Sequence, residues 1–470
     1  MSSTTGQQAL DAEQRPAEAA LRVTPQPLLE AQRDDDGEQT QAHQVPGAVV
    51  GKEFVQHPEQ HRADNRAFDG AGAADDDPSG IGTYSQAGAQ AGYGMLWAAP
   101  LLLPLAFATQ EACARLALVT GQGLAAIIKA RLPRWILVVA VILVALANTV
   151  NIAADLASMS AALRLIVPVD QTVGVISFAL VIALSEIFVP YHRYSRVLRW
   201  LCLSLLAYVA VMFVAKVDWH AVTVGTFLPH ISFSKTTFEL MIALAGTTIS
   251  PYLFFWQAAE EIEERNEAEA NGVSAEVSVD MDHVQAMRGD VFAGMLTGVF
   301  IMFSIMVTAG ATLHQAGITQ IASAEDAAMA LKPLAGDFAG LLFLLGILGV
   351  GLLSVPVLAG STAYAVAETF GWRESLERKP LEARSFYAVI LTSMILALLL
   401  NLIGIEPMQF LFLAALLNGL SAPILMVIVF VLARDKNLLG PWASGWVSQA
   451  VLGLAILAMV ALPVIWLFTK

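Results

Sequence analysis

Apolar runs near or above twenty residues in length recur along this chain from about residue 79 to its end, and short polar loops separate them. A helix needs about 20 mainly apolar residues to cross the hydrocarbon core of a bilayer. Hydrophobic residues fill 56% of the 470 positions and charged residues only 14%, whereas an ordinary soluble domain carries roughly 25% charge. The sequence therefore predicts an all-α polytopic membrane protein with many crossings rather than a single anchor.

The boundaries of the apolar runs predict about eleven transmembrane helices. They lie at roughly 79–92, 94–115, 135–166, 172–190, 197–215, 238–262, 290–312, 338–368, 385–404, 408–433 and 444–468. With the N-terminus in the cytoplasm, fifteen Lys and Arg residues fall in cytoplasmic connections and only five (Arg164, Lys216, Lys235, Lys332 and Lys470) on the other side. This asymmetry favours a cytoplasmic N-terminus and an odd number of crossings. The expected location of the protein is the cytoplasmic (inner) membrane.

The acidic charge lies mostly outside the apolar runs. The formal net charge of −14 comes mainly from residues 1–77 and from the loop 260–290, so nucleic acid is not an expected partner. Residues 1–70 are rich in Gln, Ala, Glu, Asp and Pro, the composition of a disordered tail, and residues 71–470 form the predicted membrane domain. The two cysteines give no support to a disulfide framework or a thiolate metal site.

Two sequence segments break the helical pattern, one at the start of the first span and one in the sixth. The first is Asp77-Pro78-Ser-Gly80, and the second is Gly246-Thr-Thr-Ile-Ser-Pro251. Proline lacks an amide hydrogen and glycine is flexible, so neither segment continues a regular helix. Paired interruptions at corresponding positions of two five-span halves indicate a transporter built of inverted repeats, with its substrate site between the unwound segments. The alternative is that each proline only kinks a helix, which is common in membrane spans.

The first break also contains a group of acidic residues. Unwinding frees backbone carbonyls that can bind a cation, and a carboxylate in the break supplies the countercharge. Asp77 directly precedes the proline and is the best placed candidate. Asp75 and Asp76 are expected to be solvated at the mouth of the site.

The third span carries a polar face. Asn148, Asn151, Asp155 and Ser158 lie at spacings of three and four residues on an otherwise apolar helix. Asp155 could relay a proton or an ion, or it could make a structural hydrogen bond within the bundle, since an ionisable group is expensive to leave in lipid. Gln110 and Glu111 in the second span are weaker candidates for the same pathway.

These segments resemble the Nramp family of divalent metal transporters. The resemblance covers roughly residues 71–468 and includes both breaks, the second continuing into Tyr252. It also includes Gln110-Glu-Ala-Cys-Ala-Arg-Leu-Ala-Leu-Val-Thr-Gly and Ala154-Asp-Leu-Ala. The family implies eleven or twelve spans in the LeuT-like 5+5 fold, alternating access, and uptake of Mn²⁺ or Fe²⁺, usually with protons.

The resemblance also assigns positions to a metal site. Asp77 matches the metal-binding aspartate of the family's Asp-Pro-Gly-Asn motif, and Gly80 stands where that motif has its asparagine ligand. Thr247 stands where the family uses a backbone carbonyl on the metal. Ser250 replaces the family's methionine, and Tyr252 replaces its histidine.

The same comparison assigns the polar face of the third span. Asp155 matches an aspartate of the family's proton pathway, and Ser158 replaces the glutamate that usually follows it. The lost glutamate, together with the missing histidine, bears on whether transport is coupled to protons.

The departures at the metal site bear on the substrate. Methionine is a soft ligand that favours transition metals, so its replacement by a hydroxyl removes a reason to reject Mg²⁺ or Ca²⁺. Without the asparagine the site is expected to be wider and to rely on water and carbonyls, and Mg²⁺ often keeps several waters when it is bound. The sequence resembles the Nramp-related branch, in which magnesium transport is known.

One further departure lies upstream of Asp77. In this fold an apolar half-helix precedes the aspartate, but residues 58–70 are too polar to lie in hydrocarbon. Either the first span is a short segment, or the N-terminal segment does not represent the working protein, for example through a reading-frame error upstream of about Ala71.

The predicted function is secondary transport of divalent metal cations of the Mn²⁺, Fe²⁺ and Mg²⁺ class. The metal is the substrate, no cofactor is expected, and the partners are the lipid bilayer and, where transport is coupled, protons. One alternative is a cation-coupled carrier of amino acids or other organic solutes on the same fold. The other is a membrane receptor or scaffold that transports nothing. An enzyme is not predicted, because the sequence presents no nucleophile with a base and no phosphate loop.

Overall fold

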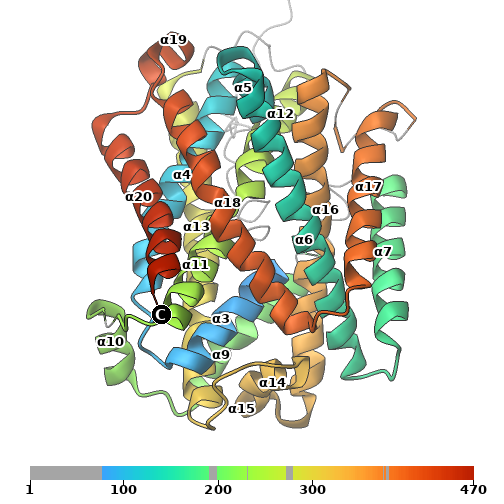
Figure 1. The fold of residues 1–470 in the computed structure, drawn as a ribbon, viewed down its shortest axis with the longest axis vertical. Coiled ribbons are helices and arrows are strands. Elements are labelled where there is room, and N and C mark those ends of the chain that lie inside the picture. Colours follow the sequence, from blue (N-terminus) through green and yellow to red (C-terminus); the bar gives the residue numbers. More distant parts are fainter. Residues whose placement is uncertain are drawn as a thin grey trace, which may run out of the picture. The chain divides into compact units, whose positions relative to one another are not determined.

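The computed structural model describes residues 77–189, 198, 200–229, 231–270, 279–373, 375–376 and 381–469. The chain divides into two units, and all of the described residues belong to the second, His57–Lys470. The predicted tail 1–70, the polar segment 58–70, Asp75 and Asp76 lie outside the described residues. In the described part, every regular element is a helix (Figure 1).

The helices follow the predicted spans closely. The long ones are α4 (Ala98–Thr120), α6 (Arg134–Arg164), α7 (Gln171–Phe188), α13 (Met281–Ala309), α16 (Ala339–Phe370), α17 (Arg384–Asn401), α18 (Pro407–Ala433) and α20 (Trp446–Phe468). The broken span consists of α11 (Lys235–Thr248) and α12 (Pro251–Ala270). Shorter helices are α3 (Pro78–Ala91), α5 (Leu124–Arg131), α9 (Leu206–Val214), α10 (Trp219–Phe227), α14 (Ala324–Ala328), α15 (Lys332–Ala335) and α19 (Lys436–Leu439).

The number of full crossings differs slightly from the eleven that the sequence predicts. Among the described residues, nine helices are long and apolar enough to cross a membrane, or ten if the bent pair Trp200–Val214 and Trp219–Phe227 is one span. Two predicted spans account for the difference. The span 197–215 corresponds to the first part of the bent pair, and the span 79–92 corresponds to α3, whose 14 residues reach only about 21 Å at 1.5 Å per residue. The predicted first span is therefore a short helix in the described part of the chain.

The helices form two sets of five that pair with each other. The first set consists of α3, α4, α6, α7 and α9, and the second of the broken pair α11/α12, α13, α16, α17 and α18. Members at the same place in each set pack together: α4 on α13, α6 on α16 and α7 on α17. Each set opens with an interrupted or shortened helix, as expected for the LeuT-like inverted-repeat fold.

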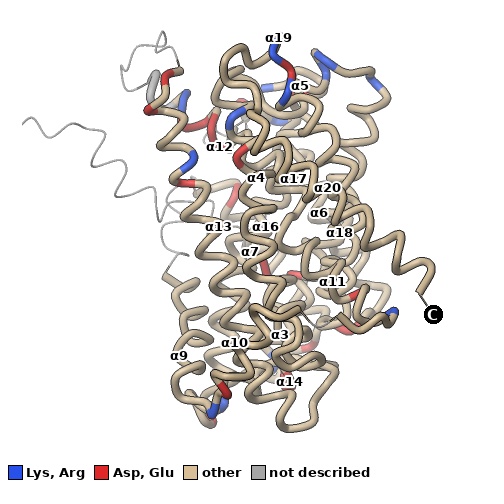
Figure 2. Tube along the Cα trace, turned by 90° about the vertical axis from the view of Figure 1, so that its left-hand side faces the viewer, with Lys and Arg blue, Asp and Glu red and all other residues tan. Residues whose placement is uncertain are grey.

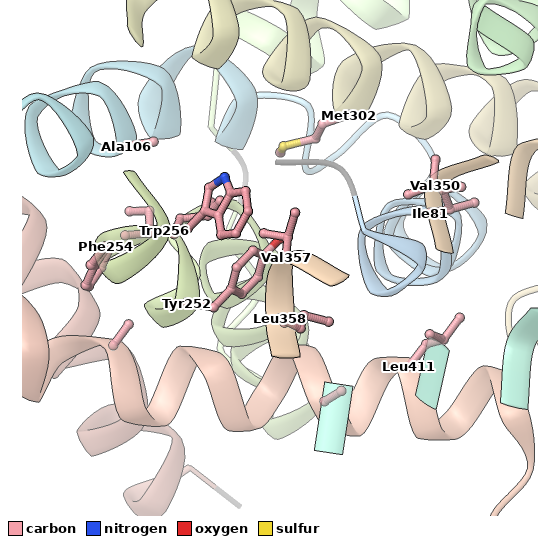
Figure 3. Close-up of a cluster of buried hydrophobic side chains, with 14 of the residues drawn as sticks. Ile81, Ala106, Tyr252, Phe254, Trp256, Met302, Val350, Val357, Leu358 and Leu411 are labelled. Atoms are coloured by element: carbon pink, nitrogen blue, oxygen red, sulfur yellow. The ribbon is translucent and has the colours of Figure 1, made fainter. Parts of the chain in front are cut away.

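The core lies where the broken helix meets its neighbours. Tyr252 and Trp256 of α12 belong to the same buried cluster as Val357 of α16 and Met302 of α13, and Figure 3 shows the two aromatic rings beside Val357. Helices α7, α17 and α20 instead expose large apolar side chains such as Leu180, which suits the hydrocarbon of a bilayer.

Basic residues gather at one end of the bundle. Figure 2 shows most of the Lys and Arg at the end that carries α5 and α19, with a smaller group at the opposite end beside α9. This distribution agrees with the asymmetry that the sequence shows between the two sets of loops.

Candidate metal site

The first break places Asp77 at the start of α3. Asp77 is the N-cap of this helix, with an extended backbone (φ −86°, ψ 166°), and Pro78 is its first residue. Aspartate is favoured at the N-cap and proline at the first helical position, so this local sequence begins a helix efficiently. Asp77 Oδ1 accepts hydrogen bonds from the Ser79 hydroxyl and, at 3.0 Å, from the Gly80 amide.

The other carboxylate oxygen of Asp77, Oδ2, is one of several buried polar atoms without a hydrogen-bond partner in this part of the bundle. Asp77 is fully buried, and among the residues that the structure describes Oδ2 has no hydrogen-bond partner. A buried polar atom left unsatisfied costs about 1–3 kcal/mol, and more when it is charged. The arrangement therefore leaves a carboxylate oxygen inside the bundle that is available to a ligand.

The second break separates α11 from α12 and is narrower than the sequence indicates. Helix α11 continues through Gly246 to Thr248, Ile249 leaves helical geometry (φ −113°, ψ 62°), and Pro251 begins α12. The carbonyls at the end of α11 lack a complete set of helical partners and carry the negative end of the helix dipole. That end is suited to a cation.

Ser250 is directed back at these carbonyls. Its hydroxyl lies 3.0 Å from the Gly246 carbonyl oxygen and 2.8 Å from that of Thr247, so the two acceptors share one hydrogen. The lone pairs of the Ser250 oxygen stay available to a hard cation. For the Thr247 carbonyl to bind a metal with full strength, the Ser250 hydroxyl must rotate away from it.

Thr247 joins the two breaks. Its hydroxyl lies 3.1 Å from the hydroxyl of Ser79 and next to the Asp77 carboxylate. One turn further along α3, the Tyr84 hydroxyl lies 3.4 Å from that of Thr248. The beginning of α3 and the end of α11 are therefore joined by two hydroxyl contacts, and the one between Ser79 and Thr247 lies beside Asp77.

Gly80 leaves less room than its lack of a side chain indicates. A Cβ atom at this position would lie 3.1 Å from the ring of Tyr84. The Tyr84 ring thus fills part of the space that the sequence alone predicts to be open, because α3 carries it one turn after Gly80.

Gly246 allows α11 to pack closely against α18 and does not interrupt the helix. It lies within α11, and a Cβ there would come within 2.2 Å of the Gly419 amide nitrogen on α18. Likewise, a Cβ atom added to Gly419 would lie 2.3 Å from the carbonyl oxygen of Ile242 on α11. The two backbones touch, so the glycine brings α11 against α18 while the unwinding itself occurs at Ile249 and Ser250.

The polar face of α6 approaches the same region. Asp155 is fully buried, and its Oδ2 accepts a hydrogen bond of 2.9 Å from Ser354 of α16. Its Oδ1 has no partner in the described part of the chain. It lies close enough to Asp77 for the two charges to interact. The Ser158 hydroxyl donates to the Asp155 carbonyl at 2.8 Å and so serves the helix backbone.

The two asparagines of this face make interhelical bonds. Asn148 donates to the Leu358 carbonyl at 3.0 Å and to two hydroxyls of α16, while its side-chain oxygen is buried without a partner. Asn151 exchanges two amide hydrogen bonds, of 2.9 and 3.2 Å, with Asn418 of α18.

Gln110 and Glu111 on α4 have contrasting surroundings. Both polar atoms of the Gln110 amide are buried, and neither has a partner among the described residues. Glu111 instead binds Arg115 through 3.0 Å contacts and Arg288 of α13 at 2.9 Å. Glu111 therefore lies in a network of ion pairs between α4 and α13.

The atoms around the two breaks that could bind a metal are all oxygens, which are hard ligands. They comprise one free carboxylate oxygen, the hydroxyls of Ser79, Thr247 and Ser250, and the carbonyls at the end of α11. No group of three or more His, Cys, Asp or Glu side chains that could hold a metal occurs among the described residues. Oxygen ligands of this kind suit Mg²⁺, Ca²⁺ and Mn²⁺, and a single charged ligand suits an ion that is bound weakly enough to be released.

Two residues of this site, Ser79 and Ser354, are not predicted by the sequence analysis. Ser79 belongs to the first break, but the sequence does not show that its hydroxyl joins Asp77 to Thr247. Ser354 is 199 positions from Asp155 and lies in an apolar helix. A search for polar residues on the inward face of the helix paired with α6 would have found it.

The fold and the two breaks define the class of protein. The bundle is similar to Mhp1, a nucleobase-cation-symport-1 family transporter, with a TM-score of 0.51, 13% identity, and coverage of 84% of this chain and 90% of that one. It is more similar to the manganese transporter of Eremococcus coleocola, with a TM-score of 0.70, 17% identity and coverage of 89% and 87%. The chain therefore has the LeuT-like fold of membrane transporters.

Sequence comparison identifies the family within this class. The family model for Nramp, described as natural resistance-associated macrophage protein-like, matches residues 71–469. The chain belongs to the Nramp family, as the two break motifs predict.

The chain is also similar to named transporters of bacteria. It is 24% identical over 394 residues to the divalent metal cation transporter MntH of Aeromonas hydrophila, covering 82% of this chain and 90% of that protein. It is 26% identical over 397 residues to MntH of Yersinia pestis, with the same coverage.

Proposed function

We propose that this chain is a secondary transporter that moves divalent metal cations across the cytoplasmic membrane by alternating access. The observation that carries the proposal is the unpartnered, fully buried Oδ2 of Asp77 beside the end of α11. A carboxylate in this position supplies the charge that a divalent cation needs after it sheds part of its water. Membership of the Nramp family and the activity named for MntH support the same function.

In this proposal each break supplies part of the site. Asp77 contributes the anionic oxygen, Thr247 contributes its carbonyl and Ser250 contributes its hydroxyl once it leaves that carbonyl. The Gly80 backbone holds the carboxylate in position through its amide. Because no thioether is present at position 250, the site accepts Mg²⁺ as well as Mn²⁺ and Fe²⁺.

Asp155 is proposed to support coupling rather than to bind the metal. Its free Oδ1 and its closeness to Asp77 allow it to take up a proton or to orient water when the metal enters or leaves. Gln110 and Ser158 are proposed to be polar groups of the same pathway, whereas the contacts of Glu111 suit a role in holding helices together.

The test is metal uptake into proteoliposomes by the Asp77→Asn variant, with Mn²⁺ and Mg²⁺ offered separately. Asparagine is as good an N-cap as aspartate, so α3 should still form. We expect uptake to fall by about 100-fold or more, because the buried negative charge that attracts the ion is lost. Uptake at the unmodified rate would refute the proposed site.

Asp170→Asn is a matched control. Asp170 is the N-cap of α7, exposed and bonded to the Thr172 and Val173 amides, so the same chemical change occurs at a cap away from the breaks. This variant should retain uptake. Calorimetric titration of both variants with Mn²⁺ separates lost binding from lost movement.

A further inference from the structure

A cavity of about 510 Å³ that is open to the surroundings of the protein lies away from the metal site, at the end of the bundle that carries α9 and α15. Its wall includes Val214 at the end of α9 with Ala215 and Lys216 after it, Leu313 in the turn that follows α13, and Met329 and Lys332 before and within α15. Cavities of about 300–1,000 Å³ commonly bind small molecules. Nothing in the proposed transport mechanism uses this one.

The charge around the cavity is unusual for this end of the molecule. Lys216 and Lys332 both line it, and they are two of only five basic residues that the sequence places on this side. Both are exposed, and in the described part of the chain neither makes a hydrogen bond or an ion pair. No carboxylate lines the cavity. Two free ammonium groups at one cavity create a site for an anion.

The remaining surroundings are those of a membrane interface. Large apolar side chains near the two lysines are exposed, namely Phe213, Val214, Met329, Leu334 and Phe338. Lysine side chains at the ends of membrane helices extend towards the head groups while their stems lie along apolar surface. An occupant with an anionic head and an apolar tail would therefore match both parts of the wall.

We propose that this cavity binds an anionic phospholipid of the membrane leaflet at this end of the bundle. The phosphate contacts Lys216 and Lys332, and the start of an acyl chain lies against Val214, Leu313 and Met329. Basic residues near a membrane surface are attracted electrostatically to anionic lipid head groups.

The position of the cavity gives the lipid a structural effect. The wall residues Ala311–Leu313 belong to a π-helical turn, Gly310–His314, that ends α13. His314 in the same turn contacts the Ala89 carbonyl of α3 at 2.9 Å, and Gly310 packs against Tyr93. Single π-helical turns within α-helices are frequently found at functional sites. A lipid in the cavity braces this turn and, through it, the end of α3, the helix that Asp77 caps.

The experiment measures thermal unfolding of delipidated protein in neutral detergent, with added phosphatidylglycerol or phosphatidylcholine. We expect phosphatidylglycerol to raise the Tm by about 3 °C more than phosphatidylcholine, as binding to the folded state alone requires. The double variant Lys216→Gln/Lys332→Gln should lose this difference. Equal effects of the two lipids on the unmodified protein, or a double variant that keeps the difference, would overturn the proposal.

Two controls define the cause. Lys235→Gln removes a lysine that lies over the Trp466 ring, 5.3 Å from its centroid, and should keep the full difference. The double variant Lys216→Arg/Lys332→Arg keeps both charges and should also keep the difference in Tm between the two lipids. If this variant loses the difference, the effect comes from packing, and the proposal that the two charges bind the lipid is overturned. Inorganic phosphate and glycerol 3-phosphate should give no comparable shift, and a shift equal to that of phosphatidylglycerol would assign the site to a free anion instead of a lipid.

Discussion

The hydroxyl of Ser79 lies 3.1 Å from that of Thr247, although 168 residues separate them in the sequence. Ser79 donates to Asp77, so Thr247 must donate to Ser79 if both hydrogen bonds form at once. The Asp77 carboxylate thus accepts hydrogen bonds from Ser79 and Gly80 at the start of α3. Thr247 at the end of α11, in the other repeat, fixes the Ser79 hydroxyl in this position. A shift of α3 against α11 would change both the charge and the carbonyls that face a cation.

Ser79→Ala should weaken metal binding while leaving the site in place. Hydrogen bonds to charged groups contribute about 1.5–3 kcal/mol, so we expect KM for Mn²⁺ uptake to rise about 10-fold or more with little change in the maximal rate. Ser177→Ala is the control, because Ser177 is an exposed serine of α7 that bonds only its own helix. An unchanged KM would show that the hydroxyl does not hold Asp77 for binding.

Ser250→Cys should change selectivity. A thiolate or thiol is a softer ligand than a hydroxyl and is of similar size, so Cd²⁺ should compete about 10-fold better against Mn²⁺ uptake while Mg²⁺ competes less well. The measurement is inhibition of Mn²⁺ uptake by each ion in parallel. Ser250→Ala separates the two effects of the substitution, since it frees the Gly246 and Thr247 carbonyls without adding sulfur. The same inhibition pattern in both variants would argue against direct contact between position 250 and the metal.

The sequence predicts the helices well because length and hydropathy decide which segments enter a membrane. The predicted ends of the third and tenth spans, 135–166 and 408–433, lie within two residues of α6 and α18. The two breaks are also predictable, since proline removes a helical amide whatever surrounds it. The π-turn at Gly310–His314 has no comparable local signal.

The site is less predictable, because it depends on how the helices are rotated against one another. The sequence indicates that Asp77 and Asp155 matter. The unpartnered oxygens of these two residues, the contact between Ser354 and Asp155, and the donation of Ser250 to carbonyls at the end of α11 follow from packing. The Tyr84 ring beside Gly80 is a further example, since the sequence alone predicts open space there. The roles of these residues in transport stay predictions.

Glu111→Gln should destabilise the protein. The Glu111 and Arg115 side chains are 5% and 2% exposed, and removing one charge of a buried pair costs about 3 kcal/mol or more because the other is left uncompensated. Arg115 also donates to the Trp442 carbonyl and to Ser444, so the loss would loosen the segment between α18 and α20. We expect a clear fall in the Tm measured in detergent.

Arg288→Gln is the matched comparison for this ion-pair network. The Arg288 side chain is 46% exposed, so its pair with Glu111 is screened by solvent and its loss should cost less than about 1 kcal/mol. Equal effects of the two variants on the Tm would contradict this order. Metal uptake by Glu111→Gln at a temperature where it remains folded tests separately whether Glu111 also belongs to the ion pathway.

Gly88→Ala should prevent α3 from packing on α13. A Cβ at position 88 would lie 2.3 Å from the Met306 carbonyl oxygen and 2.7 Å from the Ala309 Cβ, and neither atom can move without shifting α13. Overpacking of this kind costs about 1–3 kcal/mol or more, so both the Tm and uptake should fall.

Gly289→Ala is the control, because nothing lies within 4 Å of its added methyl and alanine favours a helix over glycine by up to about 1 kcal/mol. The Tm should be unchanged or higher in that variant. A Gly88→Ala protein with the unmodified Tm and uptake would mean that α3 does not rest against α13 as closely as the structure has it, and the coupling of the π-turn to Asp77 would then lose its physical basis.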